Sequence, residues 1–286
     1  MTDQSRKQAL RVDAHQHFWA LARGDYSWMS PDLGPIYRDF APGDLAPHLA
    51  AAGIEATVLV QAAATSAETR FMLDIADRTP FVHGVVGWID FEDPTEINTL
   101  REFAAHPRFK GVRPMIQDIP DVDWMLQSRL DWAYRAVIDL DLTFDLLGHQ
   151  KHLANAAVLL KRYPQMRIVI DHAMKPNIAE GAFADWADGM TRLAEETNAF
   201  CKLSGLVTEA GADWTNERLA PYVEHIIKAF GPSRLMWGSD WPVLNLAADY
   251  PRWLTAAETL VRDCTEDAQA FNAIFGGTAS HFYRLN

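Results

Sequence analysis

Three short segments, far apart in the sequence, each run from apolar residues into a histidine or an aspartate. They are residues 12–17, 168–172 and 235–242. Strand side chains alternate between two faces, so His15 and His17 point the same way and form a pair of convergent imidazoles. His172 and Asp240 end the other two segments, far downstream. Only a fold that gathers distant strand ends can unite these four residues, and a parallel barrel does so.

Eight apolar segments rich in strand-forming residues recur along the chain, and helical periodicity separates most of them. The expected strands are residues 10–17, 56–63, 82–89, 109–116, 142–148, 167–173, 200–206 and 235–242. The expected helices are residues 44–52, 67–78, 96–105, 130–140, 151–163, 183–197 and 219–230, with more helix from residue 250 onward. Such alternation implies parallel pairing through right-handed crossovers. The pattern predicts an α/β fold, a (β/α)8 TIM barrel, with an open doubly wound sheet as the alternative.

The chain has 286 residues, of which 49% are hydrophobic, so it can bury a large core. A parallel barrel needs about 250 residues, and no Gly/Ser-rich or Pro-rich linker interrupts the pattern. We therefore expect one domain over residues 1–286, with an ordered core of roughly 10–283. Two long segments, residues 23–42 and 117–128, are expected to form loops over the C-terminal mouth of the barrel.

The net charge of −12 argues against a nucleic acid or an anionic membrane surface as a partner. The first residues contain no apolar signal core, and no apolar run approaches transmembrane length. We expect a cytoplasmic enzyme that acts on a small molecule, and the sequence leaves its oligomeric state open.

In a parallel barrel the active site lies at the C-terminal ends of the strands, where His15, His17, His172 and Asp240 are all expected. A single strand-end histidine is usually structural, and the agreement of four positions is what favours a site. Three neutral imidazoles and one carboxylate can hold a zinc-like ion with an open position for water. Alternatively, the imidazoles polarise a carbonyl directly and Asp240 takes a proton from water.

Three further polar residues are expected near the strand ends. Gln61 could donate a hydrogen bond to the substrate or could simply cap the second strand. The guanidinium of Arg113, at the end of the fourth strand, could hold a carboxylate or a hydroxyl-rich ring. His149 follows the fifth strand and could reach the pocket, although it could equally begin a helix.

Two tryptophans and two lysines complete the candidate substrate-binding set. Trp28 and Trp241 could stack on the apolar face of a sugar ring, although aromatic residues are also ordinary core. Lys175 and Lys202 could contact substrate, and each could instead pair with Asp171 or another carboxylate.

Five motifs resemble the amidohydrolase superfamily, and most closely its amidohydrolase-2 branch, which contains sugar lactonases of the L-fuconolactonase and L-rhamnonolactonase type. They are DAHQHFW at residues 13–19, KGVR at 110–113, DHAMKP at 171–176, KLSGL at 202–206 and GSDWP at 238–242. The resemblance implies hydrolysis of an L-fucono-, L-rhamnono- or L-galactono-type aldonolactone without an organic cofactor. Hydrolysis of an anionic lactone of the pyrone-dicarboxylate or muconolactone type, a metal-dependent decarboxylase or hydratase, and a non-catalytic sugar-binding barrel remain alternatives.

The sequence departs from the binuclear members of that superfamily, which carry a bridging lysine or glutamate on the fourth strand and a histidine on the sixth. Here Lys110 lies before the end of the fourth strand, and Lys202 with Ser204 replaces the histidine. The resemblance therefore implies at most one divalent metal ion, with zinc the expected metal, held by His15, His17, His172 and Asp240. It also leaves metal-independent hydrolysis open.

Overall fold

The eight apolar segments form eight parallel strands that pair in sequence order, from β1 to β8. The structure is a computed structural model and describes residues 10–285. The strands are β1 (Val12–Gln16), β2 (Ala56–Val60), β3 (Val82–Gly87), β4 (Phe109–Val112), β5 (Thr143–Leu146), β6 (Arg167–Ile170), β7 (Phe200–Leu203) and β8 (Leu235–Trp237). A parallel bridge between Gln16 and Trp241 joins the last strand to the first. The expected (β/α)8 barrel is confirmed, and the open sheet is not found.

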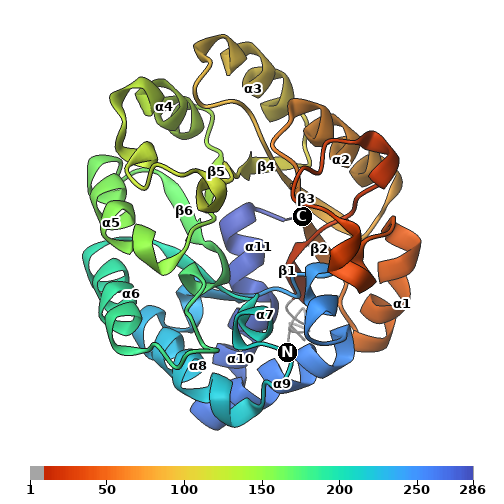
Figure 1. The fold of residues 1–286 in the computed structure, drawn as a ribbon, viewed down its shortest axis with the longest axis vertical. Helices are drawn as coiled ribbons and strands as arrows, with labels where there is room; N and C mark the ends of the chain where they lie inside the picture. Colours follow the sequence, from red (N-terminus) through yellow and green to blue (C-terminus); the bar gives the residue numbers. More distant parts are fainter. Residues whose placement is uncertain (1–9, 286) are drawn as a thin grey trace, which may run out of the picture.

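Helices cover the outside of this barrel (Figure 1). The helices of residues 10–285 are α1 (Pro42–Ala52), α2 (Ser66–Arg78), α3 (Ile97–Ala104), α4 (Asp131–Asp139), α5 (Leu153–Arg162), α6 (Ala184–Glu196), α7 (Leu206–Ala210), α8 (Asn216–Phe230), α9 (Tyr250–Cys264), α10 (Ala268–Asn272) and α11 (Thr278–Tyr283), the last of which closes one end of the barrel. All seven expected helices are present, with ends that differ by a few residues. None of the helices in residues 10–285 is both long enough and apolar enough to cross a membrane.

The expected strands extend too far at their C-terminal ends. The largest difference is in the last one, where pairing stops at Trp237, and another is in the seventh, where Leu206 begins α7 instead of ending β7. Gly205, with φ of 67°, turns the chain between the two elements. The residues that follow most of the strands remain buried, so hydrophobicity alone could not show where pairing ends.

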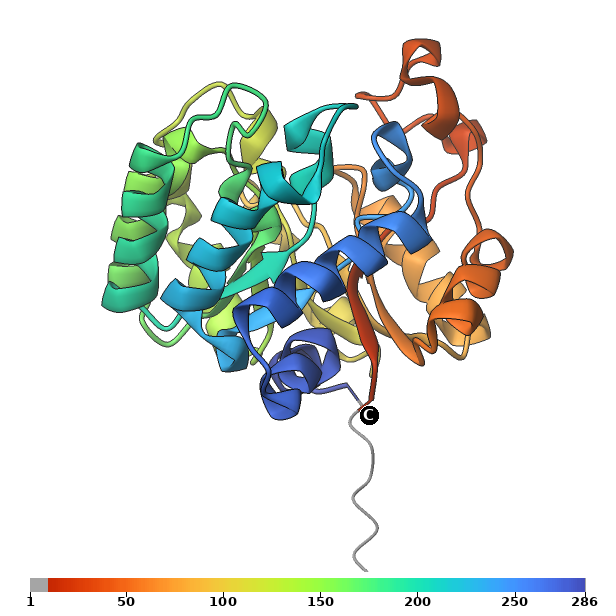
Figure 2. The same ribbon diagram turned by 90° about the horizontal axis from the view of Figure 1, so that it is seen from below.

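The C-terminal helix closes one end of the barrel. Phe282 and Tyr283 of α11 pack with small apolar side chains of the strands, among them Val58 and Val169. Viewed along the barrel, α11 lies within the ring of strands (Figure 1). From the side it lies at the opposite end from the segment 21–36 (Figure 2). The end that carries the C-terminal tips of the strands is therefore the one open to a ligand.

Candidate active site

The structure brings together all four residues of the predicted cluster at the open end of the barrel. Asp240 Oδ1 lies 3.3 Å from His17 Nε2, 3.7 Å from His15 Nε2 and 3.8 Å from His172 Nε2. The Nε2 atoms of His15 and His17 are 3.2 Å apart. All four residues are buried. Three imidazoles therefore surround one carboxylate oxygen.

Second contacts orient two of the imidazoles. His17 Nδ1 donates a hydrogen bond to the Val60 carbonyl at 2.7 Å, so its Nε2 keeps a free lone pair. His172 Nδ1 lies 2.9 Å from Ser204 Oγ. A Cβ on Gly205 would lie 2.6 Å from the same nitrogen, so the close approach of this loop to His172 requires a glycine. Outer contacts of this kind fix the direction in which each ring nitrogen points.

Left-handed backbone conformations place two of the four residues. Asp240 has φ of 58°, and His172, with φ of 52°, begins a run of four left-handed residues that ends at Lys175. For residues other than glycine this conformation costs about 1 kcal/mol or more each. Strain of this size persists only where the surrounding contacts determine the conformation, and it is typical of functional sites.

Lys202, expected in the substrate pocket, lies beneath the imidazoles, and its side chain is fully buried. Its Nζ is 2.6 Å from Asp145 Oδ2 and 2.9 Å from Asp171 Oδ1. It also lies 3.0 Å from His15 Nδ1. An ammonium group can only donate, so this contact favours the His15 tautomer with its hydrogen on Nε2, whereas Arg113 Nη1, a donor 3.3 Å from Nε2, favours the opposite tautomer. Lys202 is thus placed to neutralise two buried carboxylates and to orient His15, because a buried charge without a partner is costly.

Arg113 lines the pocket as expected, but its guanidinium is already engaged. It donates to Asp171 Oδ2 at 3.1 Å and to the Gln61 carbonyl. The Gln61 amide donates in return to the Arg113 carbonyl at 2.6 Å. Gln61 is fully buried and does not line the pocket. In place of the expected hydrogen bond to substrate, Gln61 ties the end of β2 to the end of β4.

A cavity of about 250 Å³ opens above this cluster. His17, Arg113, His172 and Asp240 form its inner end. Its other lining residues are Trp28, Leu33, Ala62, Met115, Gln117, Asp118, Leu147, Lys175, Val243 and Leu246. Both long segments expected over the mouth, residues 23–42 and 117–128, contribute to this lining. Half of the lining residues are apolar, and the side chains of Gln117, Asp118 and Lys175 add hydrogen-bonding groups.

The aromatic and histidine candidates divide between the cavity and the core. Trp28 lines the cavity, as expected. Trp241 is 2% exposed and packs edge-on against Phe18 and Phe40. Its side chain belongs to the core, although Asp240 before it and Val243 after it line the cavity. His149 is half-buried and does not line the cavity. It directly precedes the helical turn Gln150–His152, as the alternative prediction for this residue had it.

Sequence reasoning missed most of the loop residues in the lining, including Leu33, Met115, Gln117, Asp118 and Leu246. A partial signal was present, because their loops follow strands that end in site residues. Short 3-10 turns, such as Pro31–Ile36 and Ile116–Asp118, decide which side chains turn inward. Such turns leave no clear periodicity in the sequence.

Burial sets the protonation states of the cluster at neutral pH. It lowers the pKa of His15 well below the usual range and lowers the pKa of His172 to about 4. For Asp240, burial acts to raise the pKa, but the nearby imidazoles, His172 above all, outweigh it and hold the pKa below the ordinary value. At neutral pH the site therefore presents neutral imidazoles at His15 and His172 beside an ionised Asp240.

The donor atoms also fit a single metal ion. Those of His15, His17 and Asp240 are separated by 3.2, 3.3 and 3.7 Å. Ligands at zinc distances on the corners of a tetrahedron are about 3.3 Å apart. His15 can join such a site through Nε2 only in the tautomer with its hydrogen on Nδ1, a nitrogen that has Lys202 Nζ at 3.0 Å and Asp171 Oδ1 at 3.6 Å. The residues present therefore suit a tetrahedral ion with one position left open.

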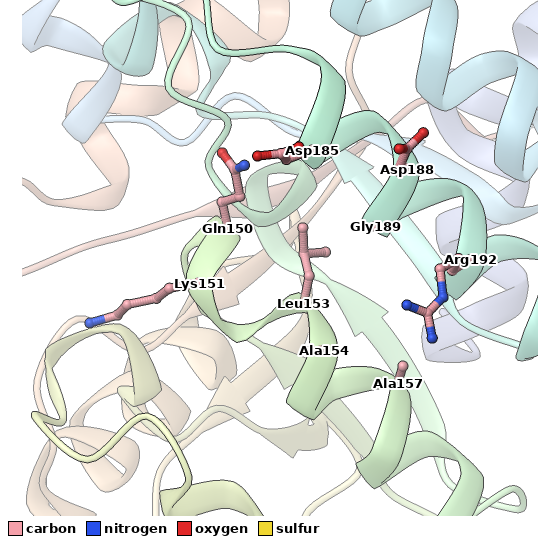
Figure 3. Close-up of a pocket in the computed structure, with 9 residues that line it drawn as sticks. All are labelled: Gln150, Lys151, Leu153, Ala154, Ala157, Asp185, Asp188, Gly189 and Arg192. Atoms are coloured by element: carbon pink, nitrogen blue, oxygen red, sulfur yellow. The ribbon is translucent and has the colours of Figure 1, made fainter.

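A larger hollow, of about 550 Å³, lies on the outside of the barrel between α5 and α6 (Figure 3). Its lining residues are Gln150, Lys151, Leu153, Ala154, Ala157, Asp185, Asp188, Gly189 and Arg192. None of them belongs to the imidazole cluster. This hollow therefore lacks the chemistry of the barrel mouth.

A (β/α)8 barrel with two histidines at β1, a third after β6 and an aspartate after β8 is typical of a hydrolase whose active-site residues can also hold a metal ion. The model of the amidohydrolase family Amidohydro_2 matches residues 12–285. The chain belongs to this amidohydrolase family.

Two relatives within the family cover nearly the whole chain. An L-fucono-1,5-lactonase of Burkholderia ambifaria is 46% identical over 97% of this chain and 96% of its own length. An L-fucono-1,5-lactonase of Burkholderia multivorans is 36% identical, with 97% of each chain covered. A crystal structure of a Burkholderia multivorans amidohydrolase with bound zinc superposes with a TM-score of 0.93, at 34% identity, over 97% of this chain and 100% of that one.

Proposed function

We propose that this amidohydrolase hydrolyses a small sugar lactone of the L-fucono-1,5-lactone type to its aldonic acid. The observation that carries the proposal is the imidazole–carboxylate cluster of His15, His17, His172 and Asp240 in a chain 46% identical to an L-fucono-1,5-lactonase. The cavity adds support, because its lining combines a tryptophan and other apolar residues with several polar side chains. Sugar rings offer an apolar face and a rim of hydroxyl groups, which suits such a lining.

The geometry supports a mechanism in which Asp240 moves the proton. Ionised Asp240 accepts a proton from water as the water oxygen attacks the lactone carbonyl carbon. Negative charge grows on the carbonyl oxygen, and the imidazole cluster, of which His17 and His172 line the cavity, stabilises it. Asp240 then returns the proton to the ring oxygen as the carbon–oxygen bond of the ester breaks. A divalent ion held by His15, His17 and Asp240 would supply Lewis-acid polarisation of the carbonyl and a lower pKa of water.

The expected cofactor is one zinc ion, and this remains part of the proposal. The donor spacing in this chain and the zinc bound by the Burkholderia multivorans amidohydrolase both support it. Elemental analysis of the purified protein, compared with that of a His17→Gln variant, tests it directly. Zinc near one equivalent in the parent and far less in the variant is the expected result. Full activity after chelation, with no metal detected, would favour direct polarisation by the imidazoles.

A dicarboxylated lactone suits the cavity less well. Two carboxylates would need two available cationic groups. Among the described residues that line the cavity, the lysine and arginine side chains are Lys175 and Arg113. Asp171 already engages the Arg113 guanidinium, so a neutral lactone is the better fit.

The test of the proposed function is hydrolysis of a stereochemically varied panel of aldonolactones, followed with a pH indicator. We expect one sugar series to be hydrolysed and Asp240→Asn to lower kcat at least a hundredfold, in line with the usual 10² to 10⁴ of acid–base catalysis. Asp185→Asn, on the outer hollow, is the matched control and should retain full activity. If no lactone is turned over, or if Asp240→Asn is nearly as active as the parent, the proposal is wrong.

A further inference from the structure

Four consecutive residues after β6 adopt the left-handed conformation, and none of them is a glycine. His172, Ala173, Met174 and Lys175 have φ of 52°, 47°, 60° and 48°. The turn is firmly held: the Lys175 amide donates to the His172 carbonyl at 2.8 Å, and the Trp186 indole donates to the Ala173 carbonyl at 2.7 Å. A rigid turn this strained calls for a function that an ordinary loop would not provide.

The turn delivers two side chains to the cavity. His172 and Lys175, at its two ends, both line it, whereas Ala173 and Met174 between them are fully buried in the core. The role of His172 in the cluster explains only the first residue of the turn. The conformation of the last residue, which also lines the cavity, remains to be explained.

Within residues 10–285, Lys175 has all its donors free for a ligand, whereas Nη1 and Nη2 of Arg113 are already engaged. Arg113 already donates to Asp171 and to the Gln61 carbonyl. The Lys175 ammonium lies 4.0 Å from Glu209 Oε1, which is an ion-pair distance but too long for a hydrogen bond. Its side chain is 20% exposed. An ammonium carries three donors, and a bound ligand can use them.

We propose that Lys175 is a substrate-binding residue that donates a hydrogen bond to a ring hydroxyl of the lactone and so selects hydroxylated lactones over unsubstituted ones. This inference rests on the proposed lactonase function. Glu209 Oε1, 4.0 Å from the ammonium, pairs with it by charge but leaves its hydrogen-bond donors free for a ligand. The carbonyl itself lies deeper, over the imidazoles, so Lys175 acts on binding and not on the bond that breaks.

The test compares Lys175→Met with the parent enzyme on two ligands, the best aldonolactone of the panel and δ-valerolactone, which lacks ring hydroxyls. Hydrogen bonds to a charged donor are typically lost with a 10- to 100-fold change. We expect KM for the aldonolactone to rise by about 10- to 100-fold while kcat changes little. For δ-valerolactone, KM as a substrate or the inhibition constant as a competitive inhibitor should stay the same. Lys175→Arg, which keeps the charge and the donors, should recover most of the lost affinity.

Two controls show whether a change in KM is specific to the loss of the Lys175 ammonium. Lys151→Met, on the outer hollow of Figure 3, removes a lysine away from the cavity and should leave both ligands unaffected. Thermal melting shows whether Lys175→Met is folded, and Lys175→Arg carries the comparison if it is not. Equal losses on both ligands, or a loss in kcat alone, would overturn the role of Lys175. Failure of the parent enzyme to hydrolyse any lactone would instead overturn the proposed function.

Discussion

At the scale of single residues, burial keeps the His172 imidazole uncharged at neutral and mildly acidic pH. Its pKa is lowered to about 4 because burial disfavours the charged ring, more strongly than Asp240 and Asp171 favour it. The neutral ring is the form that the site needs, so protonation should inactivate the enzyme. We predict that kcat/KM stays level from neutral pH down to about 5 and falls to half near pH 4. Initial rates in a pH-stat measure this, and a half-point near 6.5 would show that His172 behaves as an ordinary exposed histidine.

At the scale of elements, the left-handed turn after β6 has a measurable energetic signature. Ala173 has φ of 47° and is fully buried, and Ala194 is a buried alanine within α6. Glycine costs about 1 kcal/mol relative to alanine in a helix, but it relieves strain where φ is positive. We predict that Ala194→Gly lowers the free energy of unfolding more than Ala173→Gly does, by a margin of about 1 kcal/mol or larger. Denaturant unfolding measures both values. Equal losses would mean that the turn carries no strain.

At the scale of the whole molecule, the C-terminal helix joins the buried charges of the barrel. The Tyr283 hydroxyl donates to Asp145 Oδ2 at 2.6 Å, whereas the buried Tyr134 hydroxyl donates to the neutral Met125 carbonyl at 2.9 Å. Hydrogen bonds to charged groups contribute about 1.5–3 kcal/mol, against about 0.5–1.5 for neutral partners. We predict that Tyr283→Phe destabilises the protein more than Tyr134→Phe, as read from the two melting temperatures. A larger shift for Tyr134→Phe would contradict this role of the closing helix.

Sequence reasoning predicted most of the architecture because periodicity carries the information that a barrel needs. The spacing of His15 and His17 on one strand, and the position of His172 and Asp240 after two others, were sufficient to bring the four together. Strand ends were not predictable in the same way. The end of β8 at Trp237 depends on hydrogen bonding to β7 and not on composition.

The residues around the cluster were predicted less well, and the cause differs at each one. Lys202 and Gln61 are polar residues whose partners come from other strands, so the sequence could not show that both are buried. Trp241 follows a catalytic candidate directly, but its side chain packs into the core against Phe18 and Phe40. Local sequence indicates which residues lie near a site, whereas partners and turns decide which ones enter it.

The charges beneath the imidazoles constrain how this sequence can diverge. Lys202 pairs with Asp145 and Asp171, and Arg113 also pairs with Asp171. Two cations and two anions therefore form one network of buried side chains. Losing one member leaves an uncompensated charge, which costs several kcal/mol, whereas exchanging a pair together can be nearly neutral. Substitutions here should therefore be accepted in pairs, with strong epistasis between positions on different strands. We expect these four residues to be kept or exchanged together, while the loops that shape the cavity change more freely.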